Sequence, residues 1–377
     1  MDIKRAYKFR FYPTSEQVTI LAQTFGCARF VYNHMLRVRT DAWYERQERI
    51  GYHQTSAMLT KLKQDPEYLW LREVSSVPIQ QSLQHLQTSF NNFFAKRTKY
   101  PTFHSKHGKQ SATYVASAFK WDGKNLTLAK MKEPLAIRFS RTVPGKVTSV
   151  TVSRDKAGRY FVSMLCDDTV ELLPQATGQI GIDLGLTHFA ILSTGEKIDA
   201  PNVFRKNEKK LAKLQLRLAK KQKGSKRRAK ARLKVARLHA KIADTRQDFL
   251  HKLSTRLIRE NQTIAVETLA VKNMQKNHCL AKSIADASWS EFIRQLEYKA
   301  HWYGRTLIGI DRWYPSSKRC FDCGYIMPKL PLDVRKWICP ECGVIHDRDT
   351  NAAKNILAVG LTASAQGESA SPTQAYA

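Results

Sequence analysis

The stretch Gln179-Ile180-Gly181-Ile182-Asp183-Leu184 places one carboxylate inside an otherwise apolar run. A second apolar run, His188-Phe189-Ala190-Ile191-Leu192, follows after a short turn, and together the two runs predict a buried β-hairpin. An acid within a buried strand is costly unless an opposite charge or a cation lies beside it. Asp183 is therefore the first candidate for a functional residue.

Two further acids occupy comparable places in the sequence. Glu267 ends the run Thr263-Ile264-Ala265-Val266-Glu267, which is predicted to be a strand, and Asp349 directly precedes a predicted short helix. Three carboxylates brought together repel one another unless divalent metal neutralises them. Two Mg²⁺ ions about 3.5–4 Å apart would do so, and would also catalyse phosphodiester hydrolysis.

Each of the three acids also has a simpler explanation. Asp349 fits the N-cap of a helix, Asp183 an acid in a turn, and Glu267 a charge on an edge strand. Spacing along the chain does not show whether the three side chains converge. Both interpretations stay open on the sequence alone.

Four of the seven cysteines form two CxxC pairs, Cys320/Cys323 and Cys339/Cys342, separated by fifteen residues. This spacing is typical of a four-cysteine zinc ribbon. Four thiolates leave no open position on the ion, so the predicted Zn²⁺ is structural rather than catalytic. The other three cysteines are interpreted as ordinary thiols: Cys27, Cys166 and Cys279.

Basic residues dominate the charge of the chain. Its 377 residues include 63 Lys and Arg against 32 Asp and Glu, a formal net charge of +31, which favours nucleic acid as a partner. Residues 205–241 hold 17 of these bases and one acid, with apolar residues at helical spacing and a break at Gly224-Ser225. The pattern predicts a basic helical hairpin. A solvated charged face is the alternative, but such faces usually include acids, so we predict contact with phosphates.

Composition limits the class of protein. An apolar content of 42% and a charged content of 25% exclude wholesale disorder, a collagen-like repeat and a coiled-coil rod. No run of about 18 uncharged apolar residues occurs, so a membrane span is not expected. Without a secretory h-region near the start, we expect a protein of the bacterial or archaeal cytoplasm.

The remaining chain alternates between strand and helix patterns. Ile3–Tyr12 has the period of a strand, and Thr14-Ser15-Glu16-Gln17 has the form of a capping box that opens a helical region to about residue 108. Short strands with turn signals between residues 113 and 168 predict a small barrel or sandwich, which the opening strand could complete. Residues 171–175 are interpreted as a linker.

Several motifs resemble the TnpB family of transposon-encoded RNA-guided nucleases, which is ancestral to type V CRISPR effectors. Three of them match its nuclease motifs in order: Gly181-Ile182-Asp183-Leu184-Gly185, Ala265-Val266-Glu267-Thr268-Leu269, and Asp347-Arg348-Asp349-Thr350-Asn351-Ala352-Ala353. The zinc ribbon lies between the second and third, as in that family. Outside the nuclease, Tyr7–Thr14, Tyr100–Phe103, Asp248–Leu253 and Tyr314–Lys318 also resemble its signatures.

The resemblance implies an α/β fold plus a small β-barrel. An RNase H-like (RuvC) nuclease with a zinc-ribbon insertion would follow a wedge barrel that carries an inserted helical recognition domain. The expected segments are the first barrel strand at 1–13, the recognition domain at 14–108, the rest of the barrel at 109–175, the nuclease at 176–312 with its basic hairpin at about 205–250, the ribbon at 313–343, the third nuclease motif at 344–360 and a disordered tail at 361–377.

The resemblance also implies an activity and its residues. Asp183, Glu267 and Asp349 carry over as catalytic ligands of two Mg²⁺ ions, with Asp347 a weaker rival for the third place. Thr268 departs from the Asp or Asn that often follows the glutamate, which leaves the ligand itself intact. The implied function is cleavage of double-stranded DNA beside a short flanking motif, guided by RNA from the transposon end.

Contacts with nucleic acid and the oligomeric state are also predicted. We expect a monomer. The predicted nucleic-acid contacts are Tyr7, Lys8, Arg10, Tyr100, Lys106, Lys226, Arg227 and Arg228.

Two other functions share most of these features. A metal-dependent transposase would use the same acids without a guide. A binding-only, RNA-guided repressor would keep the charge and the zinc but tolerate loss of the acids. The presence of all three acids favours the nuclease.

Overall fold

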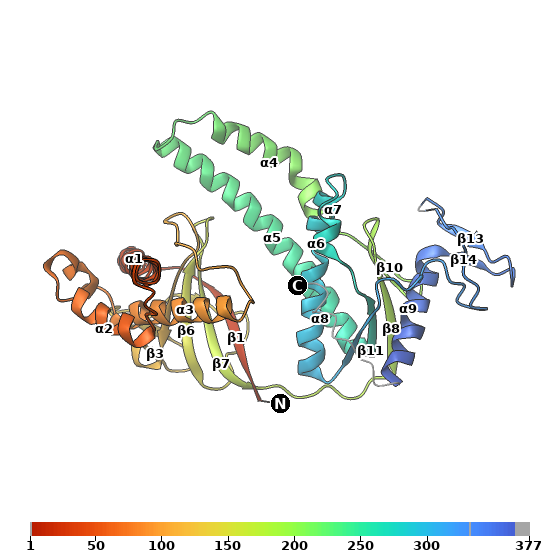
Figure 1. Cartoon of the computed structure of the whole chain (residues 1–377), viewed down its shortest axis with the longest axis horizontal. Helices are drawn as coiled ribbons and strands as arrows, with labels where there is room; N and C mark the ends of the chain where they lie inside the picture. The colour runs from red at the N-terminus through yellow and green to blue at the C-terminus, as the bar shows by residue number, and fades with distance from the viewer. Residues whose placement is uncertain (1, 332, 366–377) are drawn as a thin grey trace. The chain divides into compact units, whose positions relative to one another are not determined.

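The computed structural model describes residues 2–331 and 333–365, which form two compact units; the chain passes from the first to the second between Thr169 and Val170 (Figure 1). Each unit has its own hydrophobic core. The first unit contains β1 (Asp2–Phe11), α1 (Ser15–Arg46), α2 (Tyr52–Leu62), a 3₁₀ helix at Pro66–Arg72, α3 (Ser76–Phe94), β2 (Gln110–Val115), a 3₁₀ turn at Ala116–Ala118, β3 (Phe119–Trp121), β4 (Leu126–Leu128), β5 (Ile137–Arg138), β6 (Val147–Arg154) and β7 (Tyr160–Thr169).

The first unit is built on an antiparallel sheet with the strand order β2-β6-β7-β1-β5. β1 begins the chain yet lies inside this sheet, so the helices α1 to α3 are inserted between strands of one sheet. The β3–β4 hairpin contributes Leu126 and Leu128 to the same core. Among the described residues β2 and β5 are not paired with each other, so the strands expected to form a small barrel or sandwich make an open sheet with a hairpin packed on it.

The first long helix of this unit begins as its sequence predicts. The Thr14 hydroxyl accepts from the backbone N–H of Gln17 at 3.3 Å, and the Gln17 side chain accepts from the Thr14 N–H at 3.1 Å, which is a capping box. α3 buries Ile79, Leu83, Leu86 and Phe90 along one stripe.

The second unit contains β8 (Gly178–Leu184), β9 (His188–Leu192), β10 (Lys197–Asp199), α4 (Val203–Ala219), α5 (Lys226–Glu260), β11 (Asn261–Glu267), α6 (Val271–Met274), α7 (Ala281–Ala287), α8 (Trp289–Tyr303), β12 (Thr306–Ile310), β13 (Lys336–Ile338), β14 (Ile345–Asp347) and α9 (Arg348–Ala365). Its sheet has the order β10-β9-β8-β11-β12. β8, β11 and β12 are parallel, so their carboxyl ends meet at one edge.

Helices cover both faces of this sheet (Figure 1). Ile182 and Val266 point toward α5 and α8 and share a core with them. The intervening residues face α9: a Cβ on Gly181 would stand 2.1 Å from the Ala353 carbonyl oxygen, and Ala265 lies in a small cluster with Ile356. Glycine at position 181 therefore permits α9 to approach β8 backbone to backbone.

The end of α9 and the lack of a membrane-spanning helix among the described residues are the two remaining features that bear on predictions from the sequence. α9 continues to Ala365, so the first five residues of the predicted disordered tail are helical; the other part of that tail, 366–377, lies outside the described residues. Alanine-rich sequence such as Ala363–Ala365 extends a helix readily. None of the described helices is long and apolar enough to cross a bilayer.

Replacing Gly181 with alanine is expected to destabilise the protein. The new Cβ would collide with the α9 backbone, which cannot rotate away as a flexible side chain could, so we expect a loss at or above the upper end of the about 1–3 kcal/mol usual for overpacking. Denaturant unfolding measures it. Gly26→Ala is the matched control, because a Cβ at Gly26 in α1 meets nothing within 4 Å and should stabilise by about 0.5–1 kcal/mol. Equal stability of Gly181→Ala and the wild type would contradict this packing.

Candidate functional site

Asp183 and Glu267 lie on neighbouring parallel strands at the same level. Ala265 pairs with Gly181 and Val266 with Ile182, so the next step of the register sets Glu267 beside Asp183. Neighbouring strands run about 4.8 Å apart. Both acids are thus at the carboxyl edge of the sheet, at the ends of β8 and β11.

The two acids also point to the same face. Side chains alternate along a strand, so Asp183 shares the face of Gly181 and Glu267 shares the face of Ala265. That face is the one covered by α9.

Asp349 is in the first turn of α9, four residues before the Ala353 that lies against Gly181. Residues four apart share one side of a helix, so Asp349 is on the side of α9 that faces the sheet. All three acids therefore lie on surfaces that face each other, between the sheet and the start of α9. Their oxygen atoms are not all within 4.8 Å of one another.

Asp347 takes the capping role that the sequence left open for Asp349. Its carboxylate accepts from the Thr350 N–H at 3.0 Å and from Lys197 Nζ at 2.7 Å. Burial alone would raise the pKa of Asp347, but these hydrogen bonds outweigh burial and lower it. Asp347 is therefore occupied as an N-cap and ion pair.

Asp183 and Glu267 both have raised pKa values, because too little positive charge lies near them to offset their burial. Burial, then the nearby charges of Glu267 and Asp349, raise the pKa of Asp183 to about 7, although Arg348 and Arg335 oppose the shift. Burial raises the pKa of Glu267 to about 7 as well. A divalent cation held by carboxylate oxygens would remove this penalty, and such hard ligands suit Mg²⁺.

Arg335 is a residue of this region that the sequence did not single out. Its guanidinium lies 3.4 Å from both oxygens of Asp349. It comes from the segment between the two cysteine pairs, fourteen positions before Asp349. No local pattern marks one arginine of a basic chain, so only the folded structure identifies it.

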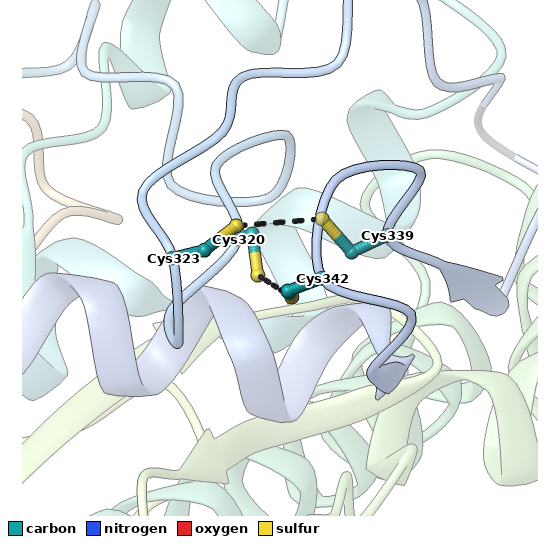
Figure 2. A group of neighbouring side chains, drawn as sticks. All are labelled: Cys320, Cys323, Cys339 and Cys342. Atoms are coloured by element: carbon teal, nitrogen blue, oxygen red, sulfur yellow. Dashed lines mark hydrogen bonds between the residues drawn. The ribbon is translucent and has the colours of Figure 1, made fainter.

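The four predicted zinc ligands form one cluster (Figure 2). The Sγ atoms of Cys320 and Cys342 are 3.6 Å apart, and those of Cys323 and Cys339 are 3.5 Å apart. A disulfide would need about 2.05 Å. Four thiolates placed tetrahedrally at about 2.3 Å from one ion would be about 3.8 Å from one another, so the cluster fits Zn²⁺.

The ribbon is joined directly to the start of α9. His346 Nε2 lies 3.0 Å from Cys320 Sγ, and the Asn351 side chain both accepts from the Phe321 N–H and donates to the Arg319 carbonyl. Asn355 donates to the same carbonyl at 2.7 Å. The first cysteine turn and the helix that bears Asp349 are therefore fixed to each other.

The basic segment forms the predicted hairpin of α4 and α5. Lys226 and Arg227 are exposed at the start of α5. Arg228 instead donates to the carbonyls of Leu218 and Lys221, so it caps the end of α4.

The side chains of the first unit that are predicted to contact nucleic acid differ in how exposed they are. Tyr7 is buried in the sheet core, because an inward position of β1 takes it there, and its hydroxyl donates to Asp168 at 2.5 Å. The predicted contact of its ring with nucleic acid would require this ring to become exposed. Lys8 is exposed above the Phe161 ring, and half-buried Arg10 lies beside the same ring. Tyr100 and Lys106 are exposed.

Comparison with family models and solved structures supports this architecture. Residues 160–278 match the OrfB_IS605 model, described as "Probable transposase", residues 289–356 match a Cas12f1-like TNB domain, and residues 1–48 match a helix-turn-helix domain. In the structure residues 2–48 hold one strand and one unbroken long helix. A cryo-EM structure of a Cas12f1–sgRNA–target DNA complex shares the fold at a TM-score of 0.57 and 13% identity, covering 94% of this chain and 98% of that one.

Curated relatives cover nearly the whole chain. A Streptomyces pristinaespiralis protein named "Putative RNA-guided DNA endonuclease" is 57% identical over 98% of this chain and 93% of its own length. An Escherichia coli K12 protein with the same description is 34% identical over 97% of this chain and 94% of its own. A TnpB-like protein of Acanthamoeba polyphaga mimivirus is 24% identical over 94% of this chain and 73% of its own. The chain belongs to the TnpB family of RNA-guided DNA endonucleases.

Proposed function

We propose that this protein is a transposon-encoded, RNA-guided endonuclease that cuts double-stranded DNA beside a short flanking motif. The observation that carries the proposal is the placement of Asp183 and Glu267 side by side on parallel strands, on the face covered by the helix of Asp349. The near-complete match to relatives named as RNA-guided DNA endonucleases supports the substrate and the guide.

Asp183, Glu267 and Asp349 are the residues that would hold Mg²⁺. A pair of ions bound there would supply an activated water and stabilise the leaving 3′ oxygen. The acids can be more than 4.8 Å apart and still serve two ions that are themselves about 3.5–4 Å apart. Arg335 gives Asp349 a positive neighbour in the absence of metal, and its guanidinium suits a phosphate oxygen equally well.

Recognition is divided between charge and base pairing. A net charge of +31, with 17 bases in residues 205–241, supplies contacts to phosphates that do not depend on sequence. A guide RNA would then read the target by pairing, as in other RNA-guided effectors. The α4–α5 hairpin, with exposed Lys226 and Arg227, is the surface we assign to these phosphates.

The function is tested by expressing the protein together with its transposon end. Purified protein should carry a discrete RNA and cut a plasmid that matches the guide. Asp183→Asn and Asp349→Asn should lower cleavage at least about a thousandfold, because a lost metal ligand removes several kcal/mol of transition-state stabilisation, while RNA and DNA binding persist.

Asp347→Asn is the matched control for the third acid. Asparagine caps a helix as well as aspartate, so cleavage should stay within about tenfold of the wild type. Cleavage by RNA-free protein would favour a transposase, and cleavage by Asp183→Asn would refute the assigned acids.

Stability offers a test of the acid site that needs no cleavage. The folded-state pKa of Asp183 is raised, so the wild type loses stability as pH rises from about 4 to about 7 and stays at the lower level above that. Without added Mg²⁺, Asp183→Asn should therefore unfold later than the wild type near pH 8, by a few kcal/mol at most, and the gap should shrink toward about pH 4.

Adding Mg²⁺ near pH 8 should stabilise the wild type and close the gap, since an ion that binds only the folded state adds its binding free energy. Thermal unfolding with and without Mg²⁺, in buffers free of chelator so that the ribbon is undisturbed, gives both readings. A variant less stable than the wild type at every pH would show that Asp183 is not under electrostatic strain.

The zinc site is tested by metal analysis of the purified chain. We expect one Zn²⁺ per chain, and Cys320→Ser should reduce it to near zero because Cys320 belongs to both groups of possible ligands at the ribbon. Cys279→Ser, at an exposed cysteine outside the ribbon, is the control and should keep the metal. Full zinc content in Cys320→Ser would contradict the assignment.

A further inference from the structure

Trp313 has the largest exposed fraction, 82%, among the exposed large hydrophobic side chains of the described residues. Single exposed apolar residues are common, but a tryptophan buries more area than other side chains when it has something to pack against. Nothing in the acid site described above uses this ring.

Trp313 follows the strand that lies next to Glu267. Ile310, the last residue of β12, pairs with Glu267, and the Thr268 N–H donates to the Ile310 carbonyl at 3.3 Å. Three residues of chain span at most about 11 Å. Trp313 is therefore held close to the edge at which Asp183 and Glu267 end.

A rigid turn keeps the ring in solvent. The Asp311 carboxylate accepts from the Trp313 N–H at 2.6 Å, and the Asp311 carbonyl accepts from the Tyr314 N–H at 3.2 Å. Directly after it, Tyr314 packs against the cluster of Ala265, Ile310 and Ile356 between sheet and α9. The backbone is fixed on both sides, so the outward direction of Trp313 is a property of the fold and not of a frayed loop.

The ring has a positively charged neighbour. The Arg312 guanidinium carbon is 5.6 Å from the Trp313 ring centroid. Arginine beside an exposed aromatic ring is the combination by which proteins hold unpaired nucleotides, because each base has a π-face and each phosphate a charge. Such binding tolerates any base sequence, as a nuclease whose target is chosen by its guide requires.

We propose that Trp313, with Arg312 beside it, is a stacking platform for an unpaired DNA base within one or two nucleotides of the phosphate that is cut. The inference rests on the proposed nuclease function, since it assigns a DNA strand to the acid edge. Trp313 is a positioning residue: it holds the strand and takes no part in the hydrolysis.

The direct test is fluorescence of a single-stranded DNA of about 12 nucleotides that carries 2-aminopurine, bound to protein with the Asp183→Asn change so that nothing is cut. Stacking on Trp313 should change the emission of the probe. Trp313→Ala should abolish that change and Trp313→Phe should retain much of it. This reading does not require cleavage, so it remains informative even if the nuclease assignment fails.

The cleavage test uses guide-loaded protein with all three acids intact. Trp313→Ala should lower kcat/KM about 5- to 150-fold, as expected for the loss of one base–aromatic stack, and Trp313→Phe should restore most of it. Leu172→Ala is the control, because it removes an apolar side chain that is 62% exposed and lies in the segment 171–175, to which no catalytic or binding role is assigned.

Two outcomes would overturn the platform. One is a Trp313→Ala protein equal to the wild type in probe emission and in kcat/KM. The other is a Trp313→Ala protein whose only change is weaker self-association in sedimentation, which would make the ring a protein contact.

Discussion

The contact of α9 with β8 at Gly181 and Ala353 is the constraint on which the acid site depends. Neighbouring strands can present Asp183 and Glu267 side by side, but a third acid must come from another element. A helix that lay one side chain farther from the sheet would carry Asp349 away from them. Gly181, which leaves room for the Ala353 carbonyl, and Gly360, whose Cβ would stand 2.7 Å from that of Ala265, hold the helix close.

Gathering these acids lowers the stability of the metal-free folded protein near neutral pH. Burial beside like charges raises the pKa of Asp183 to about 7, which means that the metal-free folded protein is strained at neutral pH. The neighbouring acids have positive partners. Asp347 forms an ion pair with Lys197 and accepts a hydrogen bond from the N-terminus of α9, and Asp349 forms an ion pair with Arg335. Sites that bind cations commonly carry such strain, because the ion relieves it.

The zinc ribbon gives the third acid a fixed frame. Asn351 and Asn355, on the helix whose first turn carries Asp349, donate to the Arg319 carbonyl beside the first cysteine pair, and Arg335 lies between the two cysteine pairs. A ribbon with a small core depends on its metal for folding free energy. Folding of the ribbon therefore also places Asp349.

Local patterns predicted most of the elements, and long-range contacts account for what they missed. The capping box at Thr14, the Gly224 break and the cysteine pairs each act over a few residues. Closure of a barrel depends on which strands end at the edges, and the inward position of Tyr7 depends on a one-residue register. Arg335 and His346 gain their meaning only from partners across the fold.

The α4–α5 hairpin shows why charge in this chain points to a partner. Its two helices contact each other through a narrow apolar strip that includes Val203, Leu211, Leu238 and Ile242. The one acid of residues 205–241, Glu208, is already paired with Lys282. The 17 bases therefore have no acid of their own segment left to neutralise them, and Arg228 is absorbed as a cap. Phosphates lying along the hairpin would lower the mutual repulsion of the others, so binding a polyanion there would also stabilise this element.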